Sequence, residues 1–589
     1  MKVRAVLFIL LAALVFSGLY AQSQEREWTD AELALQYAQW ARKAIEEDRW
    51  AEALAALERA ADFAGVSSDI SYLLAVARSH EGKSRKTVLE SLDTALQTNR
   101  WVFYSENDAL LLKSEQLIAM REYASALSVL EQTAESAEVV MRRLAALRGI
   151  ALGKAPNYDP AQALARFRSL MLSAMDRYPR DTRPLRIFFD YARNRKPQPS
   201  DLPSGDLDLL ELALRRLPFL LETDPDLAWI AAPFMRDTEA ARRYVASYRA
   251  GGLSNNKDYF EPNVASIPAA LNLGLISDID AVEELLYGDS FILNKNVITD
   301  VYNLLRSEEG RNLFTQKLLS SSLAFISSDE DSDGFMDSLT QYYSGVIQDF
   351  GYDSNQSNYF DLRILMDKNG VPVSAGFPLT GESSLIVSVF WERYPSVEMV
   401  TLDAEVFEFR PADFQFAPVT FTELGGSQNY AGLAYPVLSY QYKDITRRSL
   451  VSFCVSMTRP SAEFDGAEEQ IFFERGMPLR SVETLNGKQI SVTEFENGFP
   501  VVQRVDMDLD GRMETVRHFR RPSPDLPPPD TDGTFDFRRM IESSESDWSG
   551  DGKHKTREVY LQDGSVVYSW DMDGNGIMNY SETKTGKEQ

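Results

Sequence analysis

Residues 50–60 read Trp-Ala-Glu-Ala-Leu-Ala-Ala-Leu-Glu-Arg-Ala, and residues 123–131 read Tyr-Ala-Ser-Ala-Leu-Ser-Val-Leu-Glu. In each stretch an aromatic residue stands three positions before an alanine, and a leucine stands four positions after that alanine. A small residue where two helices cross lets their backbones approach, and a large residue one turn later fills the neighbouring groove. The pattern predicts helical hairpins at both places.

The pattern recurs along the first half of the chain. Weaker copies pair Val88 with Leu92 and Ala163 with Phe167, so the positions 53, 88, 126 and 163 are 35, 38 and 37 residues apart. This series resembles the tetratricopeptide (TPR) repeat, which has a period of about 34 residues and an Ala-x3-Phe core in its second helix. The first-helix pattern of that family is matched only in part, at Tyr37, Trp40, Ala41 and Ala44 and at Leu147, Ile150 and Ala151.

The TPR resemblance implies a solenoid with a concave face that binds protein partners. Because Ala-x3-Leu is common in any alanine-rich helix, generic helical hairpins are the alternative interpretation.

Charge and periodicity both change near residue 325. Residues 1–323 carry 38 bases and 44 acids, a net charge of −6, whereas residues 324–589 carry 23 bases and 44 acids, a net charge of −21. Apolar residues recur at helical spacing in the first part and alternate in the second. The expected fold class is multidomain α+β, with an N-terminal TPR-like α-solenoid followed by a C-terminal β-rich domain of hairpin repeats. The expected parts are a signal peptide (1–21), TPR-like helical repeats (22–195), an irregular helical continuation of the solenoid (196–324) and an acidic β-rich domain (325–589).

Four segments of the acidic part place oxygen-bearing side chains at alternate positions and then turn on a glycine. Such D-x-[DN]-x-[DN]-G loops bind Ca²⁺ because alternate oxygens of one tight turn converge on a hard cation. The predicted ligands are Asp329, Asp331, Asp333, Asp337, Asp506, Asp508, Asp510, Glu514, Asp547, Ser549, Asp551, Glu558, Asp571, Asp573, Asn575 and Glu582.

The loops that begin at Asp547 and Asp571 match the twelve-residue EF-hand loop most fully. Glu558 and Glu582 stand at their twelfth position, where an EF-hand loop carries its bidentate carboxylate. The hairpin signals between the loops indicate flanking strands instead of paired helices, so the resemblance to EF-hands covers only the loops.

The other acidic segments depart further from the pattern. The loops at 329 and 506 lack the twelfth-position glutamate, and Asp337 and Glu514 at the ninth position are the expected substitutes. More degenerate copies begin at Asp353 and Asp530. Acidic β-turns without an ion are the alternative for every loop, because Asp and Gly are frequent in turns. Mg²⁺ is less expected than Ca²⁺, because it tends to keep its waters.

Between these loops the sequence predicts an ordinary sheet. Strands are expected at 360–366, 384–391, 398–409, 449–455 and 470–474, from their β-branched and aromatic content. Cys454 is expected to be a buried strand residue.

Composition excludes several classes of function. The net charge of −27 disfavours nucleic acid as a partner, because no basic excess exists to displace phosphate counterions. One cysteine and three histidines cannot form a Cys/His zinc cluster or a disulfide framework. No nucleophile elbow, HExxH, P-loop or GxGxxG motif occurs, so we expect no enzyme and name no catalytic residue.

The first residues predict export. Lys2 and Arg4 precede an apolar run from Ala5 to Val15 and a small, polar stretch that ends at Ala21, as in a secretory signal. We expect cleavage after Ala21 and a secreted or periplasmic mature chain without a transmembrane segment. An uncleaved anchor is the alternative, although the run is shorter than the ~20 residues that span a bilayer.

Together these features predict an exported, non-enzymatic scaffold that binds protein partners through its helical repeats and carries a Ca²⁺-stabilised β domain. The alternative is an envelope protein that recognises a glycan with aromatic residues of the β domain, such as Trp391, Trp548 and Trp570.

Overall fold

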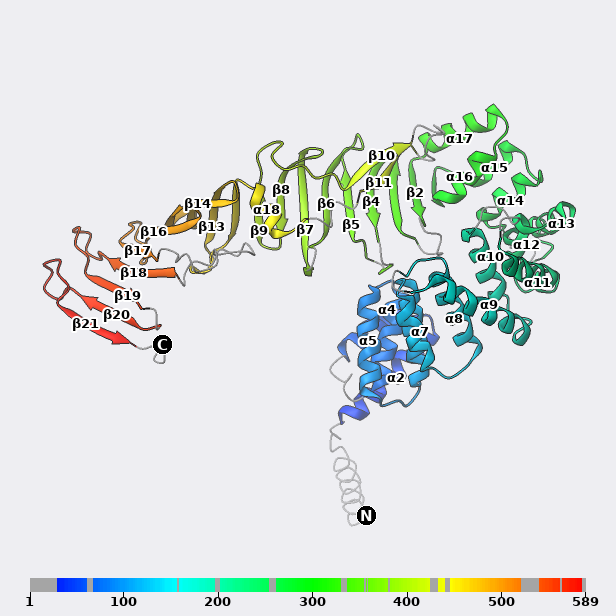
Figure 1. Cartoon of the computed structure of the whole chain (residues 1–589), viewed down its shortest axis with the longest axis horizontal. Coiled ribbons are helices and arrows are strands. Elements are labelled where there is room, and N and C mark those ends of the chain that lie inside the picture. The colour runs from blue at the N-terminus through cyan, green and yellow to red at the C-terminus, as the bar shows by residue number, and fades with distance from the viewer. Residues whose placement is uncertain are drawn as a thin grey trace, which may run out of the picture. The chain divides into compact units, whose positions relative to one another are not determined.

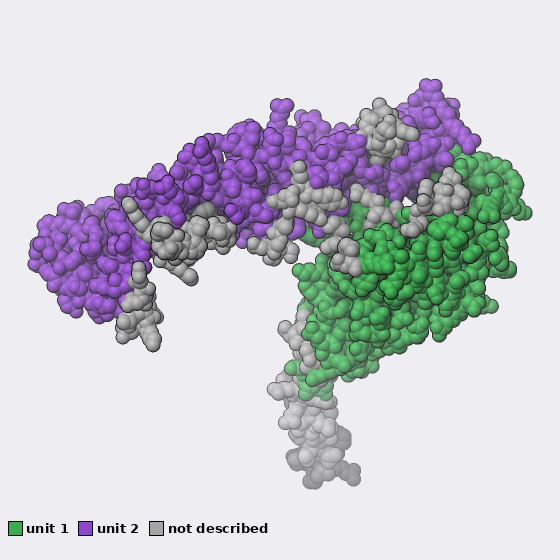
Figure 2. Space-filling model, viewed as in Figure 1, with its two compact units in different colours: residues 1–276, 329–337, 353–359 green, residues 277–328, 338–352, 360–589 purple. Residues whose placement is uncertain are grey.

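The computed structural model describes residues 29–584 apart from 61–66, 156–157, 196–201, 254–260, 330–335, 354–355, 358, 380–381, 424–432, 440–444, 521–539 and 562–563. The expected signal segment, 1–21, lies outside this range. The chain forms two compact units (Figure 2). Unit 1 comprises residues 1–276, 329–337 and 353–359, and unit 2 comprises the remainder.

Unit 1 consists of helices that pair in chain order (Figure 1). The first four pairs are α2 (Asp30–Glu46) with α3 (Trp50–Arg59), α4 (Ser68–His80) with α5 (Arg85–Thr98), α6 (Glu106–Ala119) with α7 (Tyr123–Glu131), and α8 (Ala137–Ala151) with α9 (Pro160–Arg177). The later helices are α10 (Arg183–Arg195), α11 (Ser204–Leu220), α12 (Leu227–Ala231), η3 (Ala232–Phe234), α13 (Thr238–Arg249), η5 (Val264–Ser266) and α14 (Ile267–Asn272).

Local sequence signals explain where several of these helices begin. Thr29 and Ser105 each form a capping box with the acidic residue three positions later, which satisfies two backbone N–H groups at once. The side chain of Asp159 caps α9 directly before Pro160, whose fixed φ suits the first turn of a helix.

The four predicted repeat positions lie in the second helix of each pair. Ala53, Val88, Ala126 and Ala163 are between 0% and 5% exposed. The large residues four positions later are all 0% exposed, namely Leu57, Leu92, Leu130 and Phe167. The TPR-like packing of small residue and large residue is therefore confirmed in α3, α5, α7 and α9.

The hydrophobic core extends beyond the fourth pair. One continuous cluster runs from Leu117 to Tyr248 and includes side chains of α10, α11 and α12. Polar contacts also join these helices. The half-buried Arg168 donates its Nε–H to Asp206 at 2.7 Å, and Asp206, itself 0% exposed, also accepts a hydrogen bond from the Tyr191 hydroxyl. The helical stack thus continues through α11 with both apolar and ionic packing.

Unit 2 combines a few helices, most of them near its start, with a large sheet. Its helices are α15 (Asp278–Leu285), α16 (Lys295–Leu304) and α17 (Glu308–Ser320), followed later by α18 (Arg447–Phe453). Its strands are β1 (Ser290–Asn294), β2 (Leu323–Ser328), β3 (Ser338–Tyr343), β4 (Val346–Tyr352), β5 (Leu362–Met366), β6 (Pro372–Leu379), β7 (Glu382–Arg393), β8 (Ser396–Leu402), β9 (Glu405–Glu408), β10 (Val419–Glu423), β11 (Ala434–Leu438), β12 (Ser456–Pro460), β13 (Glu468–Glu474), β14 (Met477–Leu485), β15 (Lys488–Glu496), β16 (Phe499–Val505), β17 (Thr515–Phe519), β18 (Ile541–Ser546), β19 (Thr556–Tyr560), β20 (Val566–Trp570) and β21 (Tyr580–Lys584).

The sheet is an antiparallel meander. Each strand from β2 to β9 and from β12 to β21 pairs with its neighbour in sequence, and β9 pairs with β12 across the intervening β10–β11 hairpin. β1 adds in parallel to β2. The predicted Asn497-Gly498 turn joins β15 to β16 with φ of 54° and 81°, the left-handed pair that a tight hairpin requires. The predicted domain of hairpin repeats is therefore confirmed.

Two strand predictions need correction. Residues 447–453 form helix α18, which starts at a capping box between Thr446 and Ser449, so the predicted strand 449–455 is wrong. This local cap outweighs the β-branched content of the segment. Cys454 follows the helix and is buried as predicted, but it does not lie in a strand. The predicted strand 398–409 is divided into β8 and β9 by a turn at Asp403, which has φ of 53°.

Candidate functional site

The loop between β16 and β17, residues 506–514, is the candidate metal site. Asp506 is 2% exposed, and its backbone N–H donates to the Ile490 carbonyl at 2.8 Å. The chain then reverses through Leu509 at φ 60° and Gly511 at φ 95°. Gly511 is needed because side chains other than glycine rarely adopt such a φ.

The Asp506 carboxylate organises this turn. One oxygen accepts the Asp510 backbone N–H at 3.0 Å, and the other accepts the Gly511 N–H at 2.8 Å. Arg512 forms an ion pair with Asp510 at 2.7 Å, and this hydrogen bond lowers the pKa of the Asp510 carboxyl.

Four carboxylates converge in the loop. One ligand oxygen from each of Asp506, Asp508, Asp510 and Glu514 lies within 4.8 Å of the others. In the part of the chain that the structure describes, this is the one group of three or more His, Cys, Asp or Glu side chains that meets that distance. The loop can therefore hold a metal ion.

Glu514 carries the least satisfied oxygen of the group. Its Oε1 accepts the Met507 backbone N–H at 2.8 Å. Its Oε2 is buried and has no hydrogen-bond partner among the described residues. Because a buried charged oxygen without a partner is unfavourable, this atom is the strongest indication that the loop receives a cation.

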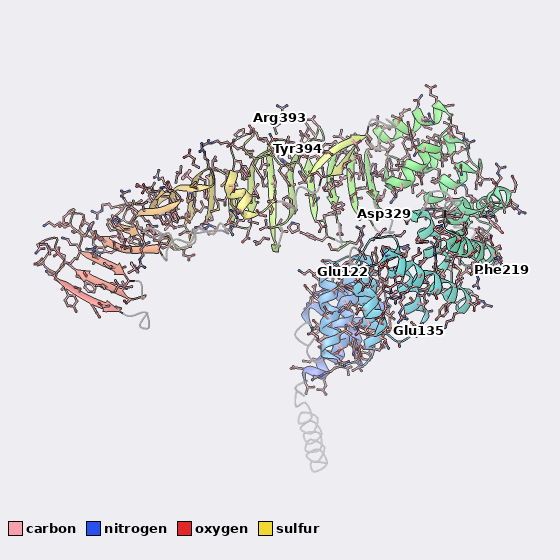
Figure 3. All side chains as sticks on the ribbon, in the orientation of Figure 1. Glu122, Glu135, Phe219, Asp329, Arg393 and Tyr394 are labelled. Atoms are coloured by element: carbon pink, nitrogen blue, oxygen red, sulfur yellow. The ribbon has the colours of Figure 1, made fainter. Side chains whose placement is uncertain are left out.

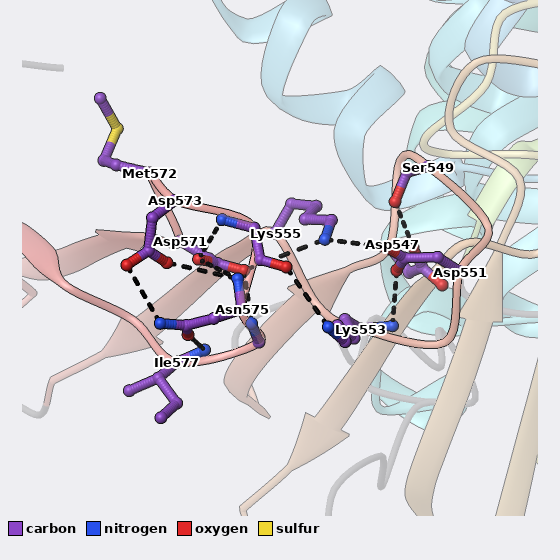
Figure 4. Close-up of polar contacts among 12 residues, drawn as sticks. Asp547, Ser549, Asp551, Lys553, Lys555, Asp571, Met572, Asp573, Asn575 and Ile577 are labelled. Carbon is purple, nitrogen blue, oxygen red and sulfur yellow. Dashed lines mark hydrogen bonds and ion pairs between the residues drawn. The ribbon is translucent and has the colours of Figure 1, made fainter.

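The loops at 547 and 571 have the same backbone design (Figure 4). In both loops the glycine at the sixth position donates its backbone N–H to the first aspartate, with an N–O distance of 2.7 Å. Gly511 donates to Asp506 in the same way. Those glycines, Gly552 and Gly576, have φ of 82° and 93°. All three acidic segments are therefore variants of one turn, as the sequence predicted.

The ninth position distinguishes the three loops. In the loop at 571 it is Asn579, whose Oδ1 accepts the Met572 N–H at 2.9 Å, just as Glu514 accepts that of Met507. In the loop at 547 it is Lys555, whose ammonium lies 3.1 Å from Asp551 and 3.9 Å from Asp571 (Figure 4). The sequence interpretation missed this lysine, although a basic residue at a ligand position was visible in the sequence.

The twelfth-position glutamates lie outside the turns. Glu558 is in β19 and accepts a hydrogen bond from the Tyr560 hydroxyl at 2.7 Å, and Glu582 is in β21. Within the described ranges, neither completes a three-carboxylate group with its loop. The predicted ligands of these two loops stay predictions.

The predicted loop at 329 lies partly outside the described residues, because Asp331 and Asp333 are not described. Asp337 is 2% exposed, forms an ion pair with Arg121, and accepts the Gln356 Nε2–H at 2.9 Å, all within unit 1. This carboxylate is therefore already engaged by a guanidinium. The degenerate copy at Asp530 lies outside the described residues, as does Asn355 of the copy at Asp353.

The predicted glycan-binding tryptophans have different surroundings. Trp391 is 6% exposed, and its indole N–H donates to the Phe416 carbonyl at 2.9 Å. Tyr394, labelled in Figure 3, packs edge-on against it with the ring centroids 5.1 Å apart. Trp391 is therefore a core residue and not an exposed binding residue, whereas Trp548 is 45% exposed.

Unit 1 has a groove that the sequence did not predict. It lies on α7, α8 and α9 and has a volume of about 700 Å³. It is lined by leucines (Leu127, Leu147 and Leu170) and by charged side chains (Glu131, Arg143 and Arg166). Arg143 is held by Glu135 at 2.8 Å, and Arg166 lies 3.7 Å from Glu131. The leucines of the groove suit the apolar side chains of a peptide segment.

Within the described ranges, no helix combines the length and the apolar character needed to cross a bilayer.

Comparison with known proteins does not assign the chain to a family. No protein-family model matches the chain. An uncharacterized protein of Treponema pallidum (strain Nichols) is 20% identical over 92% of this chain and 78% of its own length. The crystal structure of the P58(IPK) TPR domain matches 48% of this chain and 91% of its own length, at 15% identity and a TM-score of 0.17. The TPR-like description above rests on the helix pairing and burial.

Proposed function

We propose that the protein is an exported, non-enzymatic scaffold that binds a protein partner in the groove of its TPR-like helices. The observation that carries this proposal is the groove on α7–α9, which is lined by leucine, serine and charged side chains. Grooves of helical repeat stacks bind extended or helical segments of other proteins.

The groove is tested by photo-crosslinking in cells. A crosslinking amino acid at Ser169 or Ser173, both of which line the groove, is expected to capture a defined partner protein. The same amino acid at exposed Thr94 on α5 is the matched control. Ser173→Trp fills the groove and is expected to abolish capture from position 169. If capture is equal at positions 94 and 169, or survives Ser173→Trp, the groove is not the binding site.

We further propose that the ion of the loop at 506–514 is Ca²⁺. Oxygen-only ligands on a flexible turn suit Ca²⁺, whereas Mg²⁺ requires a smaller octahedral arrangement. Asn579 shows that a neutral amide is enough to close this type of turn on the N–H of the second residue. The turn can therefore close without the negative charge and the second carboxylate oxygen of Glu514. A bound cation would give both of them a partner.

The Ca²⁺ proposal is tested by thermal unfolding of the full chain. An ion that binds only the folded state stabilises it by about 2.7 kcal/mol at a hundredfold excess over Kd. We expect the Tm to rise with Ca²⁺ up to millimolar concentration, and to rise much less with Mg²⁺. Asp508→Asn with Glu514→Gln should remove the rise and leave Asp506 to hold the turn. Asp403→Asn, in the β8–β9 turn, is the control. An unchanged Ca²⁺ response in the double variant would show that the ion binds elsewhere.

Export is part of the proposal and has a direct test. The intact mass of the mature protein should correspond to a chain that begins at Gln22, after cleavage behind Ala21. A mass that includes Met1 would contradict cleavage.

Glycan recognition by the β domain is the second candidate. The exposure of Trp548 favours it, and Trp391 does not contribute because it is buried. A glycan array with the full chain tests it.

A further inference from the structure

Aromatic and acidic side chains share one face of the last three strands. In the register of β19, β20 and β21, Tyr568 stands opposite both Glu558 and Glu582, and Trp570 stands opposite Tyr580. Directly opposed residues of antiparallel strands project from the same face of a sheet. These five residues, Glu558, Tyr568, Trp570, Tyr580 and Glu582, are called the aromatic–acidic face below.

The rings of this face form a continuous surface. Tyr568 and Trp570 stack with centroids 6.2 Å apart and planes at 19°, and Trp570 and Tyr580 have centroids 5.5 Å apart. Tyr580 is 54% exposed. Trp548 lies beside them, because its indole N–H donates to the hydroxyl of Thr556, the residue opposite Trp570. Tyr568 and Trp570 are half-buried, whereas Trp548 is 45% exposed. Contiguous apolar surface with exposed rings is characteristic of binding surfaces.

The electrostatics of the face favour a cation. The faces of aromatic rings carry partial negative charge, and the carboxylates of Glu558 and Glu582 flank Tyr568. An ammonium group already occupies part of this surface, since the Lys584 Nζ lies 5.3 Å from the centroid of the Tyr568 ring. Residues 324–589 carry a net charge of −21, so the long-range field also attracts positive charge (23 bases and 44 acids).

We propose that the aromatic–acidic face docks a lysine- or arginine-rich extended segment of a partner protein. Cationic side chains lie over the rings of Trp570 and Tyr580 and pair with Glu582. A neutral sugar could stack on the same rings but would form no ion pair with the carboxylates. The carboxylates would repel an anionic ligand. The site is in unit 2 and is independent of the groove on α7–α9, so either can fail without the other.

The test uses the full chain and a fluorescent peptide of alternating lysine and threonine, read by fluorescence anisotropy. Controls are a peptide with glutamate in place of lysine, and the oligosaccharide chitohexaose. We expect the lysine peptide to bind, with affinity that falls as salt is raised. The glutamate peptide should not bind.

Variants separate this site from unspecific attraction to an acidic protein. Tyr580→Leu keeps an apolar side chain in the strand but removes the ring, and Glu582→Gln removes one charge. Tyr580→Leu should weaken binding by about two- to fivefold, the range for an exposed cation–π contact. Glu582→Gln should weaken it by up to about fivefold, as for the loss of an exposed ion pair. Tyr580→Phe should bind like the unmodified chain.

The matched controls are Tyr343→Leu on β3, where the tyrosine is 61% exposed, and Glu496→Gln on β15. If they weaken binding as much as Tyr580→Leu and Glu582→Gln do, or if those two have no effect, the proposal is overturned. Binding of chitohexaose that depends on Tyr580, without binding of the lysine peptide, would overturn it in favour of a glycan site.

Discussion

Gly149→Ala should destabilise the protein when Tyr123 is present and stabilise it when the ring of Tyr123 is removed. Gly149 lies in α8 under the ring of Tyr123, which begins α7 and is 3% exposed. A Cβ at position 149 would lie 2.4 Å from the Cζ of Tyr123 and 2.6 Å from both Cε atoms. Favourable carbon contacts need about 3.5–4.0 Å, so the buried ring must move by more than 1 Å.

Two terms oppose each other in this substitution. Alanine in a helix interior is about 1 kcal/mol more favourable than glycine. Overpacking of a dense core costs about 1–3 kcal/mol, and a clash of this depth against a buried ring belongs at the upper end. We therefore expect Gly149→Ala to lower the free energy of unfolding by about 1–2 kcal/mol.

Tyr123→Leu removes the ring, and the same Gly149→Ala substitution should then stabilise the helix by about 1 kcal/mol. The expected coupling energy between the two sites is thus about 2–3 kcal/mol, as for residues in direct contact. Urea unfolding followed by circular dichroism at 222 nm, with amide hydrogen exchange in α7 and α8, measures it. Ser125→Ala, at an exposed position of α7, is the control for helix propensity. If Gly149→Ala has the same effect in both backgrounds, the described packing of Tyr123 on Gly149 is incorrect.

Two further predictions concern buried titratable groups. Burial raises the pKa of the Cys454 thiol to about 12, so a thiol reagent at pH 8 should label the chain only after unfolding, and labelling of the folded chain would contradict its burial. Burial also raises the pKa of Glu483, with a hydrogen bond from Ser461 acting against it. A carboxyl whose pKa is raised in the folded state contributes its full share of stability below its unfolded pKa. That contribution is lost as the pH rises through the folded pKa. In Glu483→Gln, the urea concentration at the unfolding midpoint should therefore fall less steeply with pH above about pH 4.5 than in the unmodified chain. An equal fall in both proteins would contradict the raised pKa of Glu483.

The helical repeats were predictable from sequence because their signal is local. Ala53 and Leu57 are four positions apart on one helix, so their spacing alone places them on the same buried side. The groove on α7–α9 was not predictable in this way. Leu127, Leu147 and Leu170 come from three helices, and their convergence depends on how the helices pack, which no short-range pattern records.

The same distinction applies to the sheet. Asn497-Gly498 predicts a hairpin because the turn itself requires left-handed φ at both residues. The segment 447–453 misled the prediction, since its helix depends on a cap at Thr446 and its composition is typical of a strand. The buried state of Trp391 was also invisible in the sequence, because its partner Phe416 is 25 residues away.

The acidic loops show that a transferred motif can identify a turn while the elements that flank the turn decide where its later positions lie. The twelfth position was expected to supply a ligand because an EF-hand loop, which helices flank, carries its bidentate carboxylate there. Here Glu558 and Glu582 are each the third residue of a strand, and a strand advances about 3.3 Å per residue away from the turn.

The ninth position remains close to the turn, since it accepts the N–H of the second residue in the loops at 506 and 571. Lys555 supplies an internal ammonium to the carboxylates of the other two loops, whereas four carboxylates at 506–514 face a single guanidinium from Arg512. Among these three loops, the one that lacks a glutamate at the twelfth position therefore has the most carboxylates for its basic side chains.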